Sequence, residues 1–249
     1  MVELSDEELE RYARQIVLPR VGGIGQRKLK QASIAVIGAG GIGSAVIPAL
    51  AGAGIGGLTI IDSDRVELAN LHRQPLFAET DIGKPKASLA AEFVRRMNHF
   101  VDVAAKDERI DSGNARQLLA GHDLVIDGSD NFATRLAVSD ACVALAIPLI
   151  SAAAVQTQGQ VGLFRARPCY RCFVGDAFDA DDCDNCAELG VLGALTATIG
   201  SFAALVAINA SVGIDEPAPG LLHLFDAEKL SWRAMRIPAD PACRACSSA

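Results

Sequence analysis

The sequence has no run of basic residues. Its 23 Lys and Arg are interspersed with 30 Asp and Glu, which gives a net charge of −7. It therefore lacks the electrostatic footprint of a protein that binds nucleic acid or an anionic membrane surface. Internal repeats, low-complexity segments and long linkers are also missing. With 249 residues, half of them hydrophobic, the chain can bury one sizeable core.

The N-terminus, MVELSDEELE, lacks the basic and apolar regions of a secretory signal. We therefore expect a cytoplasmic protein whose seven cysteines stay reduced, which favours metal binding or reactive thiols over disulfides. One uncharged stretch, 191–214, is long enough to cross a bilayer. Its polar and glycine residues, and its lack of flanking Lys or Arg, favour a helix buried in a core or a subunit interface.

The Gly-x-Ser-x-Gly turn of a serine hydrolase is absent. Of the four histidines, His99, His122 and His223 are isolated in the sequence. We assign none of the four to catalysis.

Short apolar runs alternate with segments of helical periodicity. The runs predict strands at 34–37, 58–61, 124–126 and 149–152, with a further strand at 100–104. Helices are predicted at 42–53, 84–97, 112–120 and 132–146. This alternation predicts an α/β fold, a Rossmann-like, doubly wound, mostly parallel sheet.

The two ends of the chain follow other patterns. Ser5 and Glu8 form a capping box that predicts one helix over 5–16, while Pro48 predicts a kink or a short helix. Runs at 160–164, 221–225 and 231–237 are expected to extend the sheet antiparallel. We expect a single domain with an N-terminal helical arm (1–30), a nucleotide-binding half (31–155) and a second half (156–249).

A glycine loop follows the first predicted strand. Its glycines are Gly38, Gly40, Gly41 and Gly43, and their amides, with the helix N-terminus that follows, could hold phosphate oxygens. Asp62 ends the next strand, a position at which a carboxylate can accept hydrogen bonds from ribose hydroxyls. These features indicate a nucleotide pocket but do not separate NAD from ATP.

Polar residues further along the chain favour ATP. They are Asn70, Arg73, Gln74, Lys86, Asp130 and Asn131. Two cations and a carboxylate gathered around a phosphate chain suit phosphoryl chemistry, whereas hydride transfer does not call for them. An NAD-dependent oxidoreductase remains the alternative from another class.

Six of the seven cysteines form Cys-x-x-Cys pairs, at Cys169 and Cys172, Cys183 and Cys186, and Cys243 and Cys246. Two such pairs can bind one tetrahedral zinc. Spacing alone leaves open whether the first pair combines with the second or the third. Cys142 lies on an apolar helix and is expected in the core.

In sequence order, the motifs resemble the MoeB/ThiF/HesA superfamily, the bacterial relatives of ubiquitin-activating enzymes. The likeness runs almost end to end. It includes Glu10-Arg-Tyr-Ala-Arg14-Gln15, the glycine loop, Asn70-Leu-His-Arg-Gln74, Asp81-Ile-Gly-Lys-Pro-Lys86, Asp127-Gly-Ser-Asp-Asn131 and Cys186-Ala-Glu-Leu-Gly-Val-Leu-Gly193.

The resemblance implies ATP-dependent adenylylation of the C-terminal Gly-Gly carboxylate of a ubiquitin-like sulfur-carrier protein, with release of pyrophosphate. Within the family, the N-terminal motif favours the molybdopterin branch, with thiamine or other sulfur-carrier pathways as alternatives. No fused rhodanese-like domain is expected, so a separate sulfurtransferase or cysteine desulfurase would supply sulfur. A non-catalytic, zinc-stapled dimer that binds a ubiquitin-like protein is a third hypothesis.

The resemblance also implies roles for single residues. Gly41 and Asp62 would hold the nucleotide, Asp130 would bind Mg²⁺ and Arg14 would reach the phosphates of a neighbouring subunit in a homodimer. Sugar or phosphate contacts would come from Asn70, Arg73, Gln74 and Lys86, with Asn131 shaping the pocket. Ala69 departs from the serine that the family commonly has, which removes a hydroxyl contact.

The cysteines receive roles from the same resemblance. Zinc would be held by Cys169, Cys172, Cys243 and Cys246, which makes 156–249 the zinc-binding and carrier-binding half. Cys186 would be a catalytic thiol that forms a covalent link to the carrier. Cys183 has no assigned role.

Overall fold

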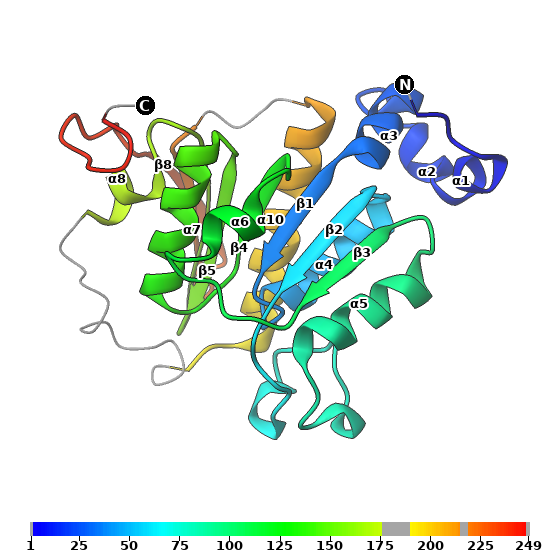
Figure 1. The fold of residues 1–249 in the computed structure, drawn as a ribbon, viewed down its shortest axis with the longest axis horizontal. Helices are drawn as coiled ribbons and strands as arrows, with labels where there is room; N and C mark the ends of the chain where they lie inside the picture. Colours follow the sequence, from blue (N-terminus) through cyan, green and yellow to red (C-terminus); the bar gives the residue numbers. More distant parts are fainter. Residues whose placement is uncertain (1, 176–189, 215–218, 248–249) are drawn as a thin grey trace.

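The computed structural model describes residues 2–175, 190–214 and 219–247. Within these residues one eight-stranded sheet runs through the molecule in the order β3-β2-β1-β4-β5-β6-β7-β8 (Figure 1). Five strands are parallel: β1 (Ser33–Ile37), β2 (Gly57–Ile61), β3 (Asp102–Lys106), β4 (Leu124–Asp127) and β5 (Leu149–Val155). Three continue the sheet antiparallel: β6 (Gln158–Phe164), β7 (Leu221–Asp226) and β8 (Ser231–Arg236). The predicted fold class is confirmed.

Helices cover both faces of the sheet (Figure 1). One face carries α4 (Gly43–Ala53), α5 (Lys86–Met97) and α10 (Gly193–Val212), and the other carries α6 (Ala115–Leu119) and α7 (Phe132–Leu145). Side chains alternate along β1: Ile34 and Val36 join the core beneath α4, while Ala35 and Ile37 join the core beneath α7. The central strands are therefore apolar on both faces, as parallel strands covered by helices must be.

The chain reverses direction across the sheet at β1. From β1 it passes through α4 to β2 on one side, and it later returns to β4 on the other side of β1. The loops after β1 and β4 consequently diverge at the carboxyl ends of these strands. Such a switch point leaves a crevice in which α/β proteins bind ligands.

The N-terminal arm differs in part from the prediction. The Ser5 capping box is confirmed, but the single helix over 5–16 is wrong, because Tyr12 separates α1 (Asp6–Arg11) from α2 (Ala13–Ile16). The Tyr12 ring is buried beside Gly54, and its hydroxyl accepts a hydrogen bond of 2.8 Å from Asn98. Anchoring this ring fixes the arm against the end of α4.

A third helix of the arm, α3 (Gly22–Gln31), was not predicted. Its sequence begins GGIG, and glycine is a weak helix former. The structure explains one of these glycines, since a Cβ at Gly25 would lie 2.8 Å from a methyl carbon of Val212 on α10. Tertiary packing therefore overrides local propensity in this helix.

Within the described part of the chain, α10 is the one helix long and apolar enough to cross a membrane by length and composition, and half of its most apolar window is buried. Leu195, Ile199 and Ala203 lie fully within the core shared with α4. The predicted packing of this segment in a core is confirmed. Close approach to α4 depends on Gly200, where a Cβ would lie 2.5 Å from the carbonyl oxygen of Ile42.

We expect Gly200→Ala to lower the free energy of unfolding by about 1–3 kcal/mol, because the added methyl overpacks the contact between α10 and α4. Urea unfolding followed by circular dichroism measures this change. Ser201→Ala, at the exposed neighbouring position of the same helix, is the matched control and should stay within about 0.5 kcal/mol of the parent. Without the close approach, Gly200→Ala would not destabilise the protein, because alanine is a better helix former than glycine. Equal stability of the two variants would therefore contradict the close approach.

Candidate nucleotide site

A cavity of about 800 Å³ opens at the carboxyl ends of β1, β2 and β4. This is within the range of small-molecule sites. The predicted nucleotide residues that line it are Gly38, Gly40, Gly41, Asp62, Asn70, Arg73, Gln74, Lys86, Asp130 and Asn131. The structure thus brings ten of these residues together around one space.

The glycine loop is packed between the backbone of the loop after β4 and the side chain of Thr196 on α10. Gly38 has φ +88°, and a Cβ there would lie 3.3 Å from the carbonyl group of Gly128 in the loop after β4. On the other side, a Cβ at Gly41 would lie 3.0 Å from the side chain of Thr196 on α10. Gly43 does not line the cavity, because it is buried against the carbonyl oxygen of Gly38.

Asp62 joins the glycine loop to the end of β2. Its carboxylate accepts hydrogen bonds of 2.7 Å from the backbone amides of Ala39 and Asp64. Burial raises the pKa of Asp62, while these two amide hydrogen bonds and the nearby Lys86 charge oppose the rise. A carboxylate fixed in this way stands where ribose hydroxyls are bound in Rossmann-like sites.

The segment after β2 presents three polar side chains to the cavity. The Asn70 amide oxygen accepts a hydrogen bond of 3.2 Å from the Glu67 amide, and the Arg73 guanidinium donates one of 2.9 Å to the Ala69 carbonyl. Because Ala69 holds Arg73 through its main chain, this contact does not need the missing hydroxyl. Gln74 is 3% exposed, and its buried amide oxygen has no hydrogen-bond partner among the described residues, so a ligand can satisfy it.

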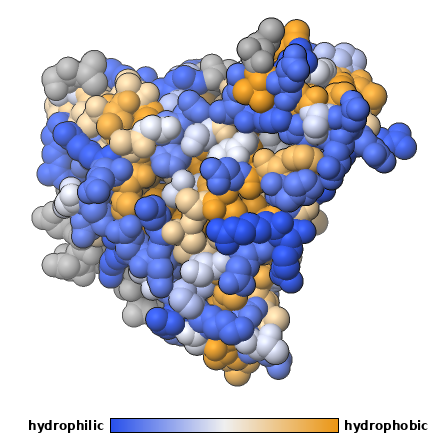
Figure 2. Space-filling model, turned by 45° about the vertical axis from the view of Figure 1, so that its right-hand side comes forward, coloured by the Kyte–Doolittle hydropathy of each residue, from blue (hydrophilic) through white to orange (hydrophobic). Residues whose placement is uncertain are grey.

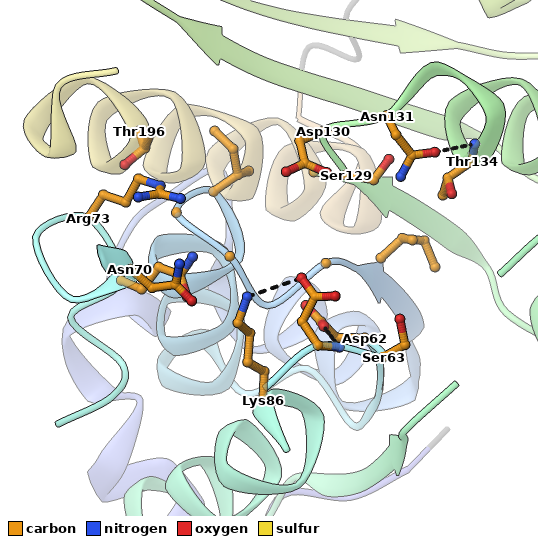
Figure 3. A pocket seen from close by; sticks show the side chains of 18 of the residues that line it. Asp62, Ser63, Asn70, Arg73, Lys86, Ser129, Asp130, Asn131, Thr134 and Thr196 are labelled. Atoms are coloured by element: carbon orange, nitrogen blue, oxygen red, sulfur yellow. Dashed lines mark hydrogen bonds and ion pairs between the residues drawn. The ribbon is translucent and has the colours of Figure 1, made fainter. Parts of the chain in front are cut away.

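Charged groups enter the cavity from different sides (Figure 3). Lys86, the first residue of α5, is 5% exposed, and its ammonium group lies 3.2 Å from the carboxylate of Asp64. Asp130 is exposed and follows β4 by three residues, next to Asn131, whose side chain caps α7 by accepting a hydrogen bond of 2.8 Å from the Thr134 amide. A phosphate chain bound here would meet Arg73, Lys86 and Asp130.

Arg14 does not line this cavity. It belongs to α2, whose neighbouring residue Gln15 donates a hydrogen bond to Ala53, the last residue of α4. The glycine loop lies at the opposite end of α4, about 16 Å away for an 11-residue helix. The helix α2, which carries Arg14, lies at the amino ends of the parallel strands (Figure 1), whereas the cavity of the same chain lies at their carboxyl ends.

The lining residues that the sequence did not single out include Asp64, Arg109, Arg135 and Thr196. Arg135 left a signal in the sequence, because it shares helical spacing with the buried residues Val138 and Cys142. A charged residue on an apolar helix face needs polar partners. Thr196 left none, since only the fold brings α10 to the glycine loop.

A second site lies at the tail. The sulfurs of Cys169, Cys172, Cys243 and Cys246 all lie within 4.8 Å of one another, with Cys169 3.6 Å from Cys243 and Cys172 3.5 Å from Cys246. Four sulfurs around zinc at 2.3 Å are separated by about 3.8 Å, so this cluster can hold zinc. Cys183 and Cys186 lie outside the described residues.

Two features of α7 bear on the cysteines. Cys142 is 2% exposed, and burial raises the pKa of its thiol, so the predicted core position is confirmed. Arg171, between Cys169 and Cys172 in the sequence, makes a two-point ion pair of 2.6 and 2.8 Å with Asp140. This pair ties the cysteine cluster to α7.

Sequence comparison decides the family. The sequence model of the ThiF family matches residues 12–245. The chain belongs to the ThiF family. A Thermus thermophilus protein named sulfur carrier protein adenylyltransferase is 43% identical over 96% of this chain and 91% of its own length. The Escherichia coli molybdopterin-synthase adenylyltransferase is 37% identical over 99% of both chains.

Some relatives are longer than this chain. A Culex quinquefasciatus protein named adenylyltransferase and sulfurtransferase MOCS3 is 41% identical over 99% of this chain but 57% of its own length. Among solved structures, E. coli MccB has a similar fold, with a TM-score of 0.83 and 25% identity over 98% of this chain and 73% of that one. The predicted family and the predicted enzyme class, an adenylyltransferase, are both confirmed.

The cysteine cluster predicts about one bound zinc per chain. Elemental analysis of purified protein measures it, and Cys243→Ala should lose most of the metal and lower the melting temperature, because three thiolates leave the site open. Cys142→Ala, which removes a cysteine outside the cluster, should keep full zinc. Full zinc content in the Cys243 variant would exclude this four-cysteine site.

Proposed function

We propose that this chain transfers the adenylyl group of ATP to the C-terminal carboxylate of a ubiquitin-like sulfur-carrier protein that ends in Gly-Gly. The observation that carries the proposal is the placement of Arg73, Lys86 and Asp130 around a glycine loop in one cavity. The name of the Thermus relative, which spans 96% of this chain, supports a sulfur carrier as the acceptor. Pyrophosphate is the second product.

The reaction forms one bond and breaks one. A carboxylate oxygen of the carrier attacks the α-phosphorus of ATP, and the bond from that phosphorus to the bridging oxygen breaks, so that pyrophosphate leaves with its electron pair. Attacker and leaving group are both anionic, so positive charge near them lowers the barrier. Arg73 and Lys86 provide this positive charge. The amides of the glycine loop bind phosphate oxygens, and the carboxylate of Asp62 accepts hydrogen bonds from the ribose hydroxyls.

The residues around Asp130 fit a magnesium ion. Its exposed carboxylate faces a cavity that would hold phosphate oxygens, and carboxylate plus phosphate is the donor set that Mg²⁺ prefers in nucleotide sites. We assign Asp130 as the protein ligand of this ion, which would neutralise phosphate charge when bound. Asn131 keeps the loop in register by capping α7.

We assign the pathway to molybdopterin synthesis, with thiamine synthesis as the alternative. Molybdopterin-synthase adenylyltransferases of Salmonella typhimurium and E. coli match this chain over 99% of both lengths, which supports the assignment. A sulfurtransferase or cysteine desulfurase would then supply sulfur to the activated carrier, and Cys186 would form the covalent link to it. A four-thiolate zinc site needs reduced cysteines, which favours the cytoplasm.

Carrier-dependent exchange of labelled pyrophosphate into ATP tests the proposal. We expect exchange with the molybdopterin sulfur carrier and none after its terminal Gly-Gly is removed, because the carboxylate would no longer reach the cavity. Asp130→Ala should lower the exchange rate about a hundredfold or more. Asp107→Ala is the matched control, because Asp107 is exposed nearby without lining the cavity.

Each outcome of this assay is informative. Exchange with the thiamine sulfur carrier alone would change the pathway assignment from molybdopterin synthesis to thiamine synthesis. No exchange with either carrier, in folded and zinc-loaded protein, would contradict adenylylation of these carriers and favour a binding role. Normal exchange by the Asp130 variant would reject its assignment to the metal.

We further propose that the active form is a homodimer in which Arg14 completes the site of the partner. Arg14 cannot serve its own cavity, because it lies beside the far end of α4, at the amino ends of the parallel strands. Exposed apolar side chains flank it on the arm: Val17 is 72%, Leu18 52% and Ile24 64% exposed. Hydrophobic surface also gathers at the top of the molecule, where the N-terminal helices lie (Figure 2). Covering this surface would give the dimer a stabilising apolar contact.

Mixing two inactive variants tests the shared site. The Arg14→Ala variant should be inactive because it lacks the guanidinium that completes the partner's site. The Asp130→Ala variant should be inactive because it lacks the proposed metal ligand. Random exchange of subunits makes half of the dimers mixed, and each mixed dimer has one complete site, so about a quarter of the wild-type exchange rate should return. No recovery after verified subunit exchange would show that Arg14 does not act across the dimer.

A further inference from the structure

Arg135 is a buried cation at the wall of the cavity that the proposed reaction does not use. It lies in the first turn of α7 and is 6% exposed. Its guanidinium donates to two acceptors on β5, the hydroxyl of Ser151 at 3.0 Å and the carbonyl of Ala152 at 2.9 Å. It also donates to the carbonyl of Ser129 in the loop after β4. One side chain therefore joins three segments.

The loop that Arg135 holds carries Asp130. Ser129, which precedes Asp130, is fixed at both backbone groups: its amide donates a 2.9 Å hydrogen bond to Asp127, and its carbonyl accepts from Arg135. Asn131, which follows Asp130, is fixed by its cap on Thr134. Asp130 itself is exposed, so the backbone on either side of it sets the direction of its Cα–Cβ bond.

We propose that Arg135 is a positioning residue that fixes the 128–131 loop so that the carboxylate of Asp130 faces the nucleotide. The inference rests on the proposed function, since it gives Asp130 the role of metal ligand. A metal site loses affinity when its ligand is free to turn, and groups that orient a ligand without touching the metal matter for that reason. Arg135 acts through Ser129 and does not need to touch the nucleotide.

The chemistry of the side chain suits this role. A guanidinium has five N–H donors in a planar fork, and in this protein they serve acceptors on two separate segments at once. Lysine has the same charge on a flexible stem but no planar fork. Arg135→Lys should therefore leave the loop less ordered even though the charge is kept, and Arg135→Met should remove both the charge and the hydrogen bonds.

Hydrogen exchange of the ligand-free protein tests the loop directly. We expect backbone amides in the 128–131 loop to exchange about tenfold faster in Arg135→Met, because opening of the loop becomes easier. Asp140→Asn is the matched control: Asp140 lies on the same helix α7, and its replacement weakens the contact with another buried arginine, Arg171 of α8 (Tyr170–Val174). It should leave exchange in this loop unchanged.

Two outcomes of the exchange experiment overturn the proposal. One is loop exchange in Arg135→Met that is no faster than in Asp140→Asn, which would give Arg135 a general role in stability only. The other is full wild-type protection in Arg135→Lys, because charge alone would then hold the loop. Partial protection in the lysine variant supports the three-segment contact.

ATP binding tests the consequence for the metal. The ratio of the ATP dissociation constants in EDTA and in Mg²⁺ measures how strongly the ion tightens ATP binding, and calorimetry gives both constants. We expect Asp130→Ala to bring this ratio close to one, Arg135→Met to lower it at least about fivefold, and Asp140→Asn to leave it unchanged. An unchanged ratio in Arg135→Met would overturn the positioning role.

The two measurements separate the inference from the function beneath it. A wild-type protein whose ATP binding is the same with and without Mg²⁺ would reject the metal site, and with it the role of Arg135 in orienting a metal ligand. The exchange result would still decide whether Arg135 orders the loop. Failure of the proposed function and failure of the loop contact thus give different results.

Discussion

The glycine loop packs directly against the backbone of the loop after β4 and against the Thr196 side chain of α10, and the site depends on this close approach. Gly38 lies against the loop after β4, and Gly41 lies against Thr196 at the start of α10. Any Cβ at these positions would separate the segments and widen the crevice. The contacts bring residues far apart in the sequence, from Asp62 to Asp130, to one cavity. Backbone geometry therefore precedes side-chain chemistry in building the site.

Sequence periodicity identifies those parts of the fold whose structure is decided mainly by the burial of apolar side chains. The runs at 34–37, 58–61 and 124–126 are apolar on both faces, which indicates central parallel strands covered by helices. The N-terminal arm is harder to predict. Helix α3 contains a glycine that its contact with α10 requires, and α1 ends at Tyr12, whose buried hydroxyl accepts a hydrogen bond from Asn98. Such tertiary reasons do not appear in local patterns.

The residues of the candidate site also divide into those that local sequence predicts and those that only tertiary contacts reveal. Loop glycines, Asp62 and the polar residues after β2 and β4 were predictable from their position after strands, since the carboxyl ends of parallel strands share one edge of a sheet. Cys-x-x-Cys spacing predicted a metal site, but it could not choose between pairs separated by tens of residues. Arg135 was missed because its importance comes from acceptors on β5 and in the β4 loop, which only the folded chain brings to it.

The ion pair between Lys86 and Asp64 has a consequence for what the site admits. In the ligand-free protein the ammonium group of this nearly buried lysine already has an anionic neighbour at 3.2 Å. An incoming anion must offer Lys86 a better interaction than Asp64 does before it gains from the lysine. A single weak anion has little advantage over a carboxylate, whereas a triphosphate brings several negative charges at once. This ion pair is therefore expected to favour ligands that carry several negative charges over those that carry one.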